Sequence, residues 1–188
     1  MVKRILMALS GTPFTTSATE HAIELARRHG ASVTGVTLVD TARLSDVGPV
    51  PIGGATAAYS LTSERLLITE ERIEEQLARF RKRCEAEDVP YRVVREEGDP
   101  LEQLTSLWRY HDMTLFGLRG LFEYGVVHNP DDQIIKMIAR GVRPILAVAE
   151  KHRNIRRVLI AYNGSVEAAR AMHLMLHLSP FPDIETRI

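Results

Sequence analysis

The strongest constraint on the fold is a regular alternation of short apolar runs with longer segments of helical periodicity. The apolar runs fall at residues 4–9, 31–40, 91–96, 113–118 and 143–150. The helical segments between them fall at residues 15–30, 63–88, 98–111 and 131–140. Strands that alternate with helices in this way form right-handed βαβ units and a parallel sheet. The sequence therefore predicts an α/β fold with a five-stranded parallel sheet and helices on both faces.

The longest predicted helix, over 63–88, carries one apolar stripe with intervals of three, four or seven residues: Leu66, Ile73, Leu77, Phe80 and Cys84. Cys84 is the only cysteine, and its place on the stripe predicts a buried structural thiol. Residues 41–62 are rich in Gly, Pro, Ala and Ser, which predicts a long surface loop. At the end of the helix predicted over 15–30, Gly30 stands where a C-terminal cap belongs.

Composition excludes several classes of partner. Lys plus Arg and Asp plus Glu both number 24 in 188 residues, so the net charge is zero. This balance argues against a general electrostatic attraction to nucleic acid or to an anionic membrane. No apolar run approaches the length of a membrane span, and the N-terminus lacks the apolar core of a signal peptide. We therefore expect a cytoplasmic protein with neither nucleic acid nor membrane as partner.

The opening of the chain recurs near its end. One shift of the sequence places Ile5-Leu6-Met7-Ala8 over Val158-Leu159-Ile160-Ala161 and Gly11 over Gly164. Such a shift is typical of a tandem duplication. We expect one α/β domain over 1–151 and an incomplete β-α-β start of a second copy over 152–188. A lone start of this kind leaves an apolar face exposed, so the chain is either shortened or completed by a neighbouring chain.

Three segments carry a resemblance to a known family. They are RILMALSGTPFTTSATEHAIELARRHGASVTGVTLVD at 4–40, EEGDPLEQL at 96–104, and DMTLFGLRGLFEYG with PILAVAE between 112 and 150. In order and spacing they resemble the universal stress proteins in their tandem form. The resemblance implies a Rossmann-like sandwich, either ATP binding or no nucleotide, and no well-defined catalysis. It also implies a homodimer through the last strand, at Ile145, Leu146, Ala147 and Val148.

The glycine motif of this family is incomplete here. Nucleotide-binding members carry G-x2-G-x9-G-[S/T] after strand four, and Gly117 and Gly120 match its first two glycines. Pro130 and Asp131 stand at the last two positions. Members that bind ATP also usually carry Asp at the end of strand one, where this chain has Ser10. The departures predict that the first copy is degenerate at the nucleotide site.

The helix start at this position is poorly suited to phosphate. Pro130 removes a backbone N–H, and Asp131 and Asp132 place two carboxylates on the first turn. Each would repel a phosphate about 4 Å away by roughly 1–4 kcal/mol. A Mg²⁺ bridge would reverse that sign. No cofactor is therefore certain, and ATP with magnesium is the alternative.

The candidate ATP cleft lies at the carboxyl ends of strands one and four, where ligands of open α/β sheets bind. Its candidate residues are Ser10, Gly11, Thr12, Val39, Gly117, Arg119 and Gly120. In the alternative interpretation, residues 9–12 and 117–120 are plain turns. No catalytic or metal-binding residue is predicted. His21 and His29 lie too far apart on one helix to share a metal ion.

Three functional hypotheses remain open. The favoured one is a non-catalytic stress-response protein whose degenerate first copy pairs with a second universal stress protein domain and with another chain. The second is an ATP-binding stress sensor that uses the cleft. The third, an enzyme of the related nucleotide-hydrolysing classes, is weakest, because no G-x4-G-K-[S/T], G-x-S-x-G or H-E-x-x-H motif occurs.

Overall fold

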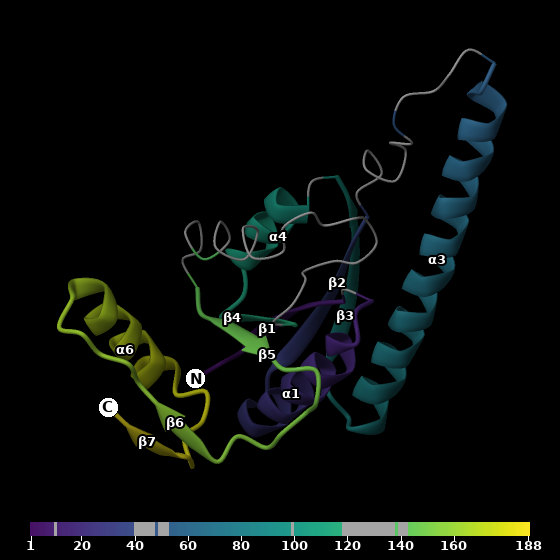
Figure 1. Ribbon diagram of the computed structural model, residues 1–188. Helices are drawn as coiled ribbons and strands as arrows, with labels where there is room; N and C mark the ends of the chain where they lie inside the picture. The colour runs from purple at the N-terminus through teal and green to yellow at the C-terminus, as the bar shows by residue number, and fades with distance from the viewer. Residues whose placement is uncertain (10, 40–47, 49–52, 99, 118–137, 139–142) are drawn as a thin grey trace.

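A five-stranded parallel sheet forms the centre of the computed structural model (Figure 1), which describes residues 1–9, 11–39, 48, 53–98, 100–117, 138 and 143–188. The strand order is β3-β2-β1-β4-β5. The strands are β1 (Arg4–Ala8), β2 (Ser32–Val39), β3 (Tyr91–Glu97), β4 (Met113–Gly117) and β5 (Ile145–Val148). All four pairings between neighbours are parallel. The predicted fold class is confirmed, and each strand overlaps its predicted range.

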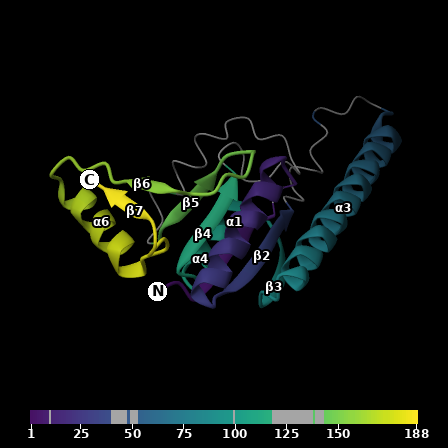
Figure 2. The same ribbon diagram turned by 90° about the horizontal axis from the view of Figure 1, so that it is seen from below.

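Helices cover both faces of this sheet. Helix α1 (Phe14–His29) and helix α3 (Ala55–Ala86) lie side by side on one face (Figure 2), and α4 (Pro100–Trp108) covers the other (Figure 1). The chain moves outward from β1 to β2 to β3, so right-handed crossovers place α1 and α3 together. From β3 the chain returns across the sheet to β4 on the other side of β1. A right-handed crossover in this direction places α4 on the face opposite α1 and α3. Among the described residues, none of the helices has an apolar stretch that would span a bilayer.

The core lies around the central strand β1, whose side chains are buried on both faces of the sheet, as expected for a parallel strand covered by helices. The apolar stripe of α3 is also confirmed. Ile73, Leu77, Phe80 and Cys84 are buried, and Leu66 packs at the margin of the core. Burial raises the pKa of the Cys84 thiol to about 11, which keeps it protonated and unreactive near neutral pH. Gly30 is the left-handed C-cap of α1.

The loop predicted over 41–62 is wrong at its carboxyl end, because α3 begins at Ala55. Alanine has the highest helix propensity, and extending an existing helix requires no new nucleus. The Ala-rich residues 55–58 therefore continue the amphipathic part of α3 toward its N-terminus, where the helix projects beyond the sheet (Figure 1). The rest of that predicted loop lies outside the described residues, apart from Gly48, Gly53 and Gly54. So does the helix predicted over 131–140, apart from Ile138, which is helical.

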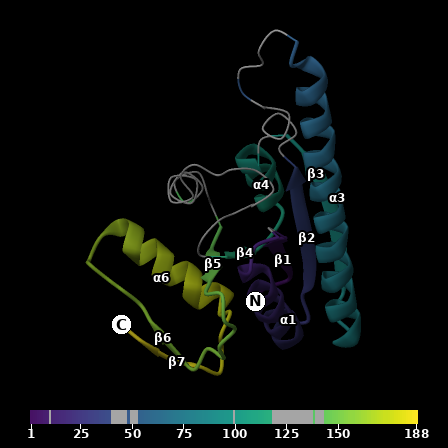
Figure 3. The same ribbon diagram turned by 45° about the vertical axis from the view of Figure 1, so that its right-hand side comes forward.

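A separate β-α-β unit follows the large sheet. Strand β6 (Arg157–Leu159) pairs in parallel with β7 (Glu185–Arg187), and helix α6 (Val166–Leu178) connects them. The Ser165 side chain caps α6 by accepting a hydrogen bond from the Ala168 N–H at 3.1 Å. Figure 3 shows this unit on the opposite side of the large sheet from α3. Several of its apolar side chains are exposed: Leu159, Val166, Leu176 and Ile188.

The β-α-β unit contacts the end of α1. The buried ring of His29 donates from Nε2 to the Pro180 carbonyl at 2.9 Å. The Arg28 guanidinium lies 5.9 Å from the centre of the Phe181 ring, within range of a cation–π interaction. Phe181 also packs against the hydrophobic core. These contacts place residues 180–181 against the same helix that covers the large sheet.

A buried hydrogen-bond chain joins α4 to the sheet through His111, which is 1% exposed. Its Nδ1 lies 2.7 Å from the Leu107 carbonyl and therefore carries the proton. In the neutral ring, Nε2 then accepts from the Thr34 hydroxyl at 2.9 Å, and Thr34 Oγ1 accepts from Arg92 Nε at 3.0 Å. Burial lowers the pKa of His111, with the hydrogen bond to Leu107 opposing that effect. Burial therefore favours the neutral form of His111.

This network predicts a loss of stability on acidification. Between the ordinary pKa near 6.5 and the lower folded-state pKa, unfolded His111 binds a proton that the folded protein does not bind. The free energy of unfolding should therefore fall as the pH drops below about 6.5. Urea unfolding at a series of pH values measures this dependence. His111→Gln should flatten it while lowering stability by about 1–3 kcal/mol at neutral pH.

The matched control is His173→Gln, which changes an exposed histidine on α6. That variant should keep the wild-type pH dependence. The free energy of unfolding of the His111 variant should still depend weakly on pH because of His21, whose pKa is also lowered by burial. The same pH dependence of the free energy of unfolding in wild type and His111→Gln would contradict the prediction.

Candidate functional site

The predicted cleft lies where the strand order changes direction. The chain leaves β1 toward β2 on one side, whereas β4 is added on the other. Because all the strands are parallel, their carboxyl ends meet at one edge of the sheet, beside the start of α1 (Figure 1). Four of the predicted residues reach this edge: Gly11, Thr12, Val39 and Gly117. Ser10, Arg119 and Gly120 lie outside the described residues.

Phe14 packs closely on Gly117 at the end of β4. A Cβ atom added at Gly117 would lie 2.9 Å from Phe14 Cγ and nearer still to Phe14 Cβ, inside any normal contact distance. Glycine at this position therefore lets the first residue of α1 approach the strand. The close approach gives Gly117 a packing role that requires no ligand.

Thr12 and Val39 are buried at this edge. The Thr12 carbonyl accepts a hydrogen bond from the Thr15 N–H at 3.0 Å, which closes the turn before α1. The Val39 carbonyl accepts one from the Gly98 N–H at 3.1 Å, which ties the end of β2 to the loop after β3. Both backbone groups thus stabilise the local structure of the loops.

The start of α1 keeps the electrostatic character of an anion site. Its N-cap residue, Pro13, makes no side-chain capping hydrogen bond, and its first turn contains no acidic residue. The first turn itself therefore supplies no carboxylate to offset the positive end of the helix dipole at this edge of the sheet.

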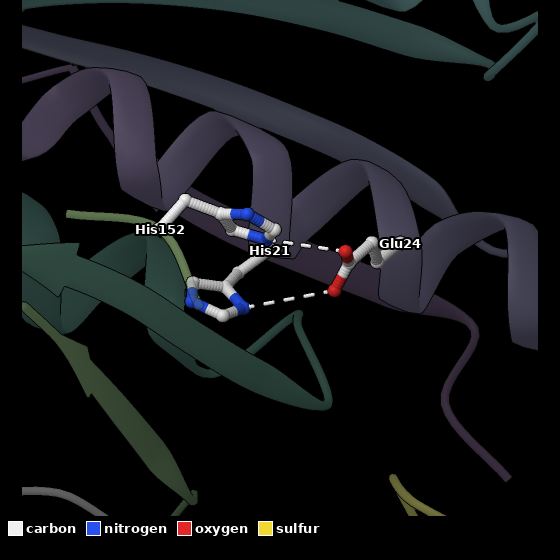
Figure 4. Close-up of side chains that lie close together, drawn as sticks. All are labelled: His21, Glu24 and His152. Carbon is white, nitrogen blue, oxygen red and sulfur yellow. Dashed lines mark ion pairs between the residues drawn. The ribbon is translucent and has the colours of Figure 1, made fainter. Parts of the chain in front are cut away.

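A second group of polar side chains lies on the middle of α1 (Figure 4). His21 and Glu24 are one turn apart on the helix, and His152 comes from the segment that follows β5. The two imidazole rings lie against each other, and the Glu24 carboxylate lies beside both of them. Its Oε2 is 3.8 Å from His21 Nδ1, and its Oε1 is 3.1 Å from His152 Nε2. The ring centres are 4.4 Å apart. This group was not predicted from the sequence.

The electrostatics of the group favour neutral imidazole at His21. Burial lowers the pKa of His21, and the neighbouring His152 lowers it further, while Glu24 and Glu20 oppose the shift. Glu20 is itself bound to Arg83 of α3 through two hydrogen bonds, of 2.8 and 2.7 Å. That pairing lowers the pKa of the Glu20 carboxyl and occupies both of its oxygens.

An open cavity of about 700 Å³ adjoins this group. It lies between α1, the end of α3 and the segment that leads into the β-α-β unit. The lining carries both signs of charge beside three apolar side chains, and its residues are Glu20, Ile23, Glu24, Arg27, Arg28, Arg83, Glu87, Asn154, Ile155 and Phe181. Charged and polar side chains thus predominate in the lining of the cavity.

Comparison with known proteins identifies a family. The pattern of the family described as "Usp: Universal stress protein family" matches residues 1–116. No curated protein is significantly similar to the chain.

Solved structures share the fold at low sequence identity. A hypothetical protein whose biochemical function was assigned from its structure is 14% identical, with a TM-score of 0.60, over 81% of this chain and 99% of its own. A universal stress protein in complex with cAMP is also 14% identical, with a TM-score of 0.52. The match covers 80% of this chain and 98% of the chain in that structure. A member of the universal stress protein family from Burkholderia pseudomallei is 18% identical, with a TM-score of 0.47. The match covers 78% of this chain and 96% of the chain in that structure.

The contact between Phe14 and Gly117 yields a stability prediction. Gly117→Ala should lower the free energy of unfolding by about 1–3 kcal/mol, because the new methyl group overlaps Phe14. Urea unfolding measures the change. In a Phe14→Ala/Gly117→Ala double variant, the loss should be smaller than the sum of the two single losses. Strictly additive losses would show that the two residues do not pack against each other.

Proposed function

Because the chain belongs to the universal stress protein family, we propose that it is a non-catalytic stress-response protein of the tandem type. Residues 1–151 form a copy that is degenerate at the nucleotide site and serves mainly in pairing. Residues 152–188 begin a second copy. The observation that carries the pairing role is the uncharged outer edge of β5.

The two edges of the large sheet differ sharply in charge. The β3 edge carries Arg92, Arg95, Glu96 and Glu97, and Arg95 forms ion pairs with Glu70 and Glu74 of α3. The β5 edge, Ile145–Val148, carries no charge. Charged side chains are a common protection of sheet edges against pairing with another chain. Their absence on β5 favours the addition of a strand from a partner.

The hydrogen-bonding groups of β5 are also suited to pairing. The Thr114 N–H of β4 donates to the Pro144 carbonyl at 3.0 Å. In a parallel ladder this bond determines which N–H groups of β5 face β4 and which face outward. The N–H groups of Leu146 and Val148 point toward β4, and those of Ile145 and Ala147 point away from it. A strand from a second copy or a second domain can bind these outward groups.

Strand register supports the tandem part of the proposal. In the large sheet, Ile5 pairs with Val33, and in the β-α-β unit Val158 pairs with Thr186. The two pairs have the same spacing along the chain, and Ile5 and Val158 are the residues that the internal repeat aligns. Exposed apolar residues such as Leu159 and Ile188 are expected of a copy whose remaining elements would cover them.

Two features support a degenerate nucleotide site. Phe14 packs on Gly117, the first glycine of the family motif. The sequence places Pro130 and Asp131, followed by Asp132, where binding members have Gly-Ser or Gly-Thr at the start of a helix. The first feature fills space beside the strand end, and the second replaces phosphate-binding N–H groups with negative charge.

The edge of β5 generates the first test. Ala147→Lys places a charge on an exposed position of the proposed interface, so it should weaken dimerisation at least about tenfold, or about 1.4 kcal/mol. Ala57→Lys, at an exposed position of α3, should leave dimerisation unchanged. Sedimentation equilibrium measures both. A wild-type dissociation constant weaker than about 100 µM, or equal effects of the two substitutions, would contradict pairing through β5.

The uncapped start of α1 favours a second candidate function, an ATP-binding stress sensor. The first turn of α1 carries no acidic residue to offset the helix dipole, and one universal stress protein of the same fold forms a complex with cAMP. In this alternative a nucleotide phosphate binds near Gly11 and Gly120. Magnesium would then bridge the phosphates to Asp131 and Asp132.

Calorimetric titration with ATP and Mg²⁺, and separately with cAMP, distinguishes the two functions. The degenerate copy should bind neither nucleotide more tightly than about 1 mM. Binding that is at least tenfold tighter, and is abolished by Gly120→Val without loss of the circular dichroism signal of the fold, would transfer the function to the sensor. Gly54→Val provides the control, because Gly54 precedes α3 and has a negative φ of −86°.

A further inference from the structure

We propose that His21, Glu24 and His152 form a binding site for Zn²⁺ or a chemically similar divalent transition-metal ion. The site would join the middle of α1 to the segment that leads from β5 into the β-α-β unit (Figure 4). This proposal does not depend on pairing through β5 or on the state of the nucleotide cleft.

The donor set is one that zinc uses in proteins. Two imidazole nitrogens and one carboxylate oxygen bind zinc and leave a fourth position for water. Here one ligand atom from each of the three residues lies within 4.8 Å of the other two. Tetrahedral coordination at the usual bond lengths requires separations of about 3.3 Å. Side-chain adjustments of about 1 Å, well within the range of rotamer changes, therefore complete the coordination.

The three side chains converge without satisfying one another. His152 Nε2 is buried and has no hydrogen-bond partner among the described residues, although it lies 3.1 Å from Glu24 Oε1. The short distance thus lacks the orientation of a hydrogen bond. The 3.8 Å between His21 Nδ1 and Glu24 Oε2 is too long for one. A cation between the three groups would satisfy all of them at once, and Figure 4 shows the two rings facing opposite oxygens of one carboxylate.

The surroundings hold the ligands in a form that can bind metal. His21 is buried on α1, and burial favours its neutral imidazole, the form that coordinates a metal ion. Glu20 does not compete as a ligand, because Arg83 occupies both of its oxygens. Glu24 also lines the open cavity, which leaves room for water as the remaining ligand.

A second pair of histidines requires a control. His173 and His177 are four residues apart on α6, and both are exposed. Two imidazoles at this spacing lie on one face of a helix and can bind a divalent metal weakly. Any measurement on the whole chain must therefore separate the two pairs.

The experiment is a competition titration of the full chain with Zn²⁺ against a chromophoric chelator. We expect one Zn²⁺ per chain with a dissociation constant below about 1 µM. His152→Ala and Glu24→Gln should each weaken binding at least about tenfold, since losing even an outer-shell partner typically costs 10- to 100-fold. Both side chains are partly exposed, so the fold should survive these changes. His173→Ala should bind as the wild type does.

Co²⁺ provides an independent readout of the coordination. The wild type and His173→Ala should give the visible absorption bands of a four- or five-coordinate Co²⁺ ion, and His152→Ala should lose them. The proposal is overturned if wild-type binding is weaker than about 100 µM. It is equally overturned if binding survives His152→Ala and Glu24→Gln but is lost in His173→Ala.

Discussion

The packing of α1 is the interaction on which the rest of the structure depends. Its first residue, Phe14, lies against Gly117 at the end of β4, and its middle binds α3 through the ion pair of Glu20 with Arg83. Its last residue, His29, contacts the β-α-β unit. One helix therefore sets the position of the sheet edge, the long helix and the smaller unit relative to one another. A displacement of α1 would alter both the cleft and the histidine group.

Most of the fold could be predicted because its elements differ in apolar periodicity. The runs that became β1, β2 and β4 are rich in apolar residues, as buried parallel strands require, and the stripe of α3 has helical spacing. The start of α3 was missed for a physical reason. Its N-cap is Gly54 without a side-chain hydrogen bond, and its first turn has no acidic residue, so the usual signals of a helix start are absent.

The candidate sites could be predicted only in part. A motif placed Gly117 at the cleft, but its packing partner, Phe14, carries no pattern that links it to the distant strand end. The histidine group was beyond sequence reasoning because His152 lies outside any periodic element. Helical spacing relates His21 only to residues of its own helix, such as His29. Its neighbour in the structure, His152, comes from a segment that folds back along α1.

The parallel register also bears on the order of folding. Strand β1 pairs with β2, which follows after one helix, and with β4, which begins only at Met113. Contacts that are close in sequence form before distant ones, so β1, α1 and β2 can associate well before the sheet is complete. The β6-α6-β7 unit has the same strand spacing, and within the described part of the chain its sheet consists of these two strands. It therefore has the arrangement through which a nascent sheet of this kind first passes.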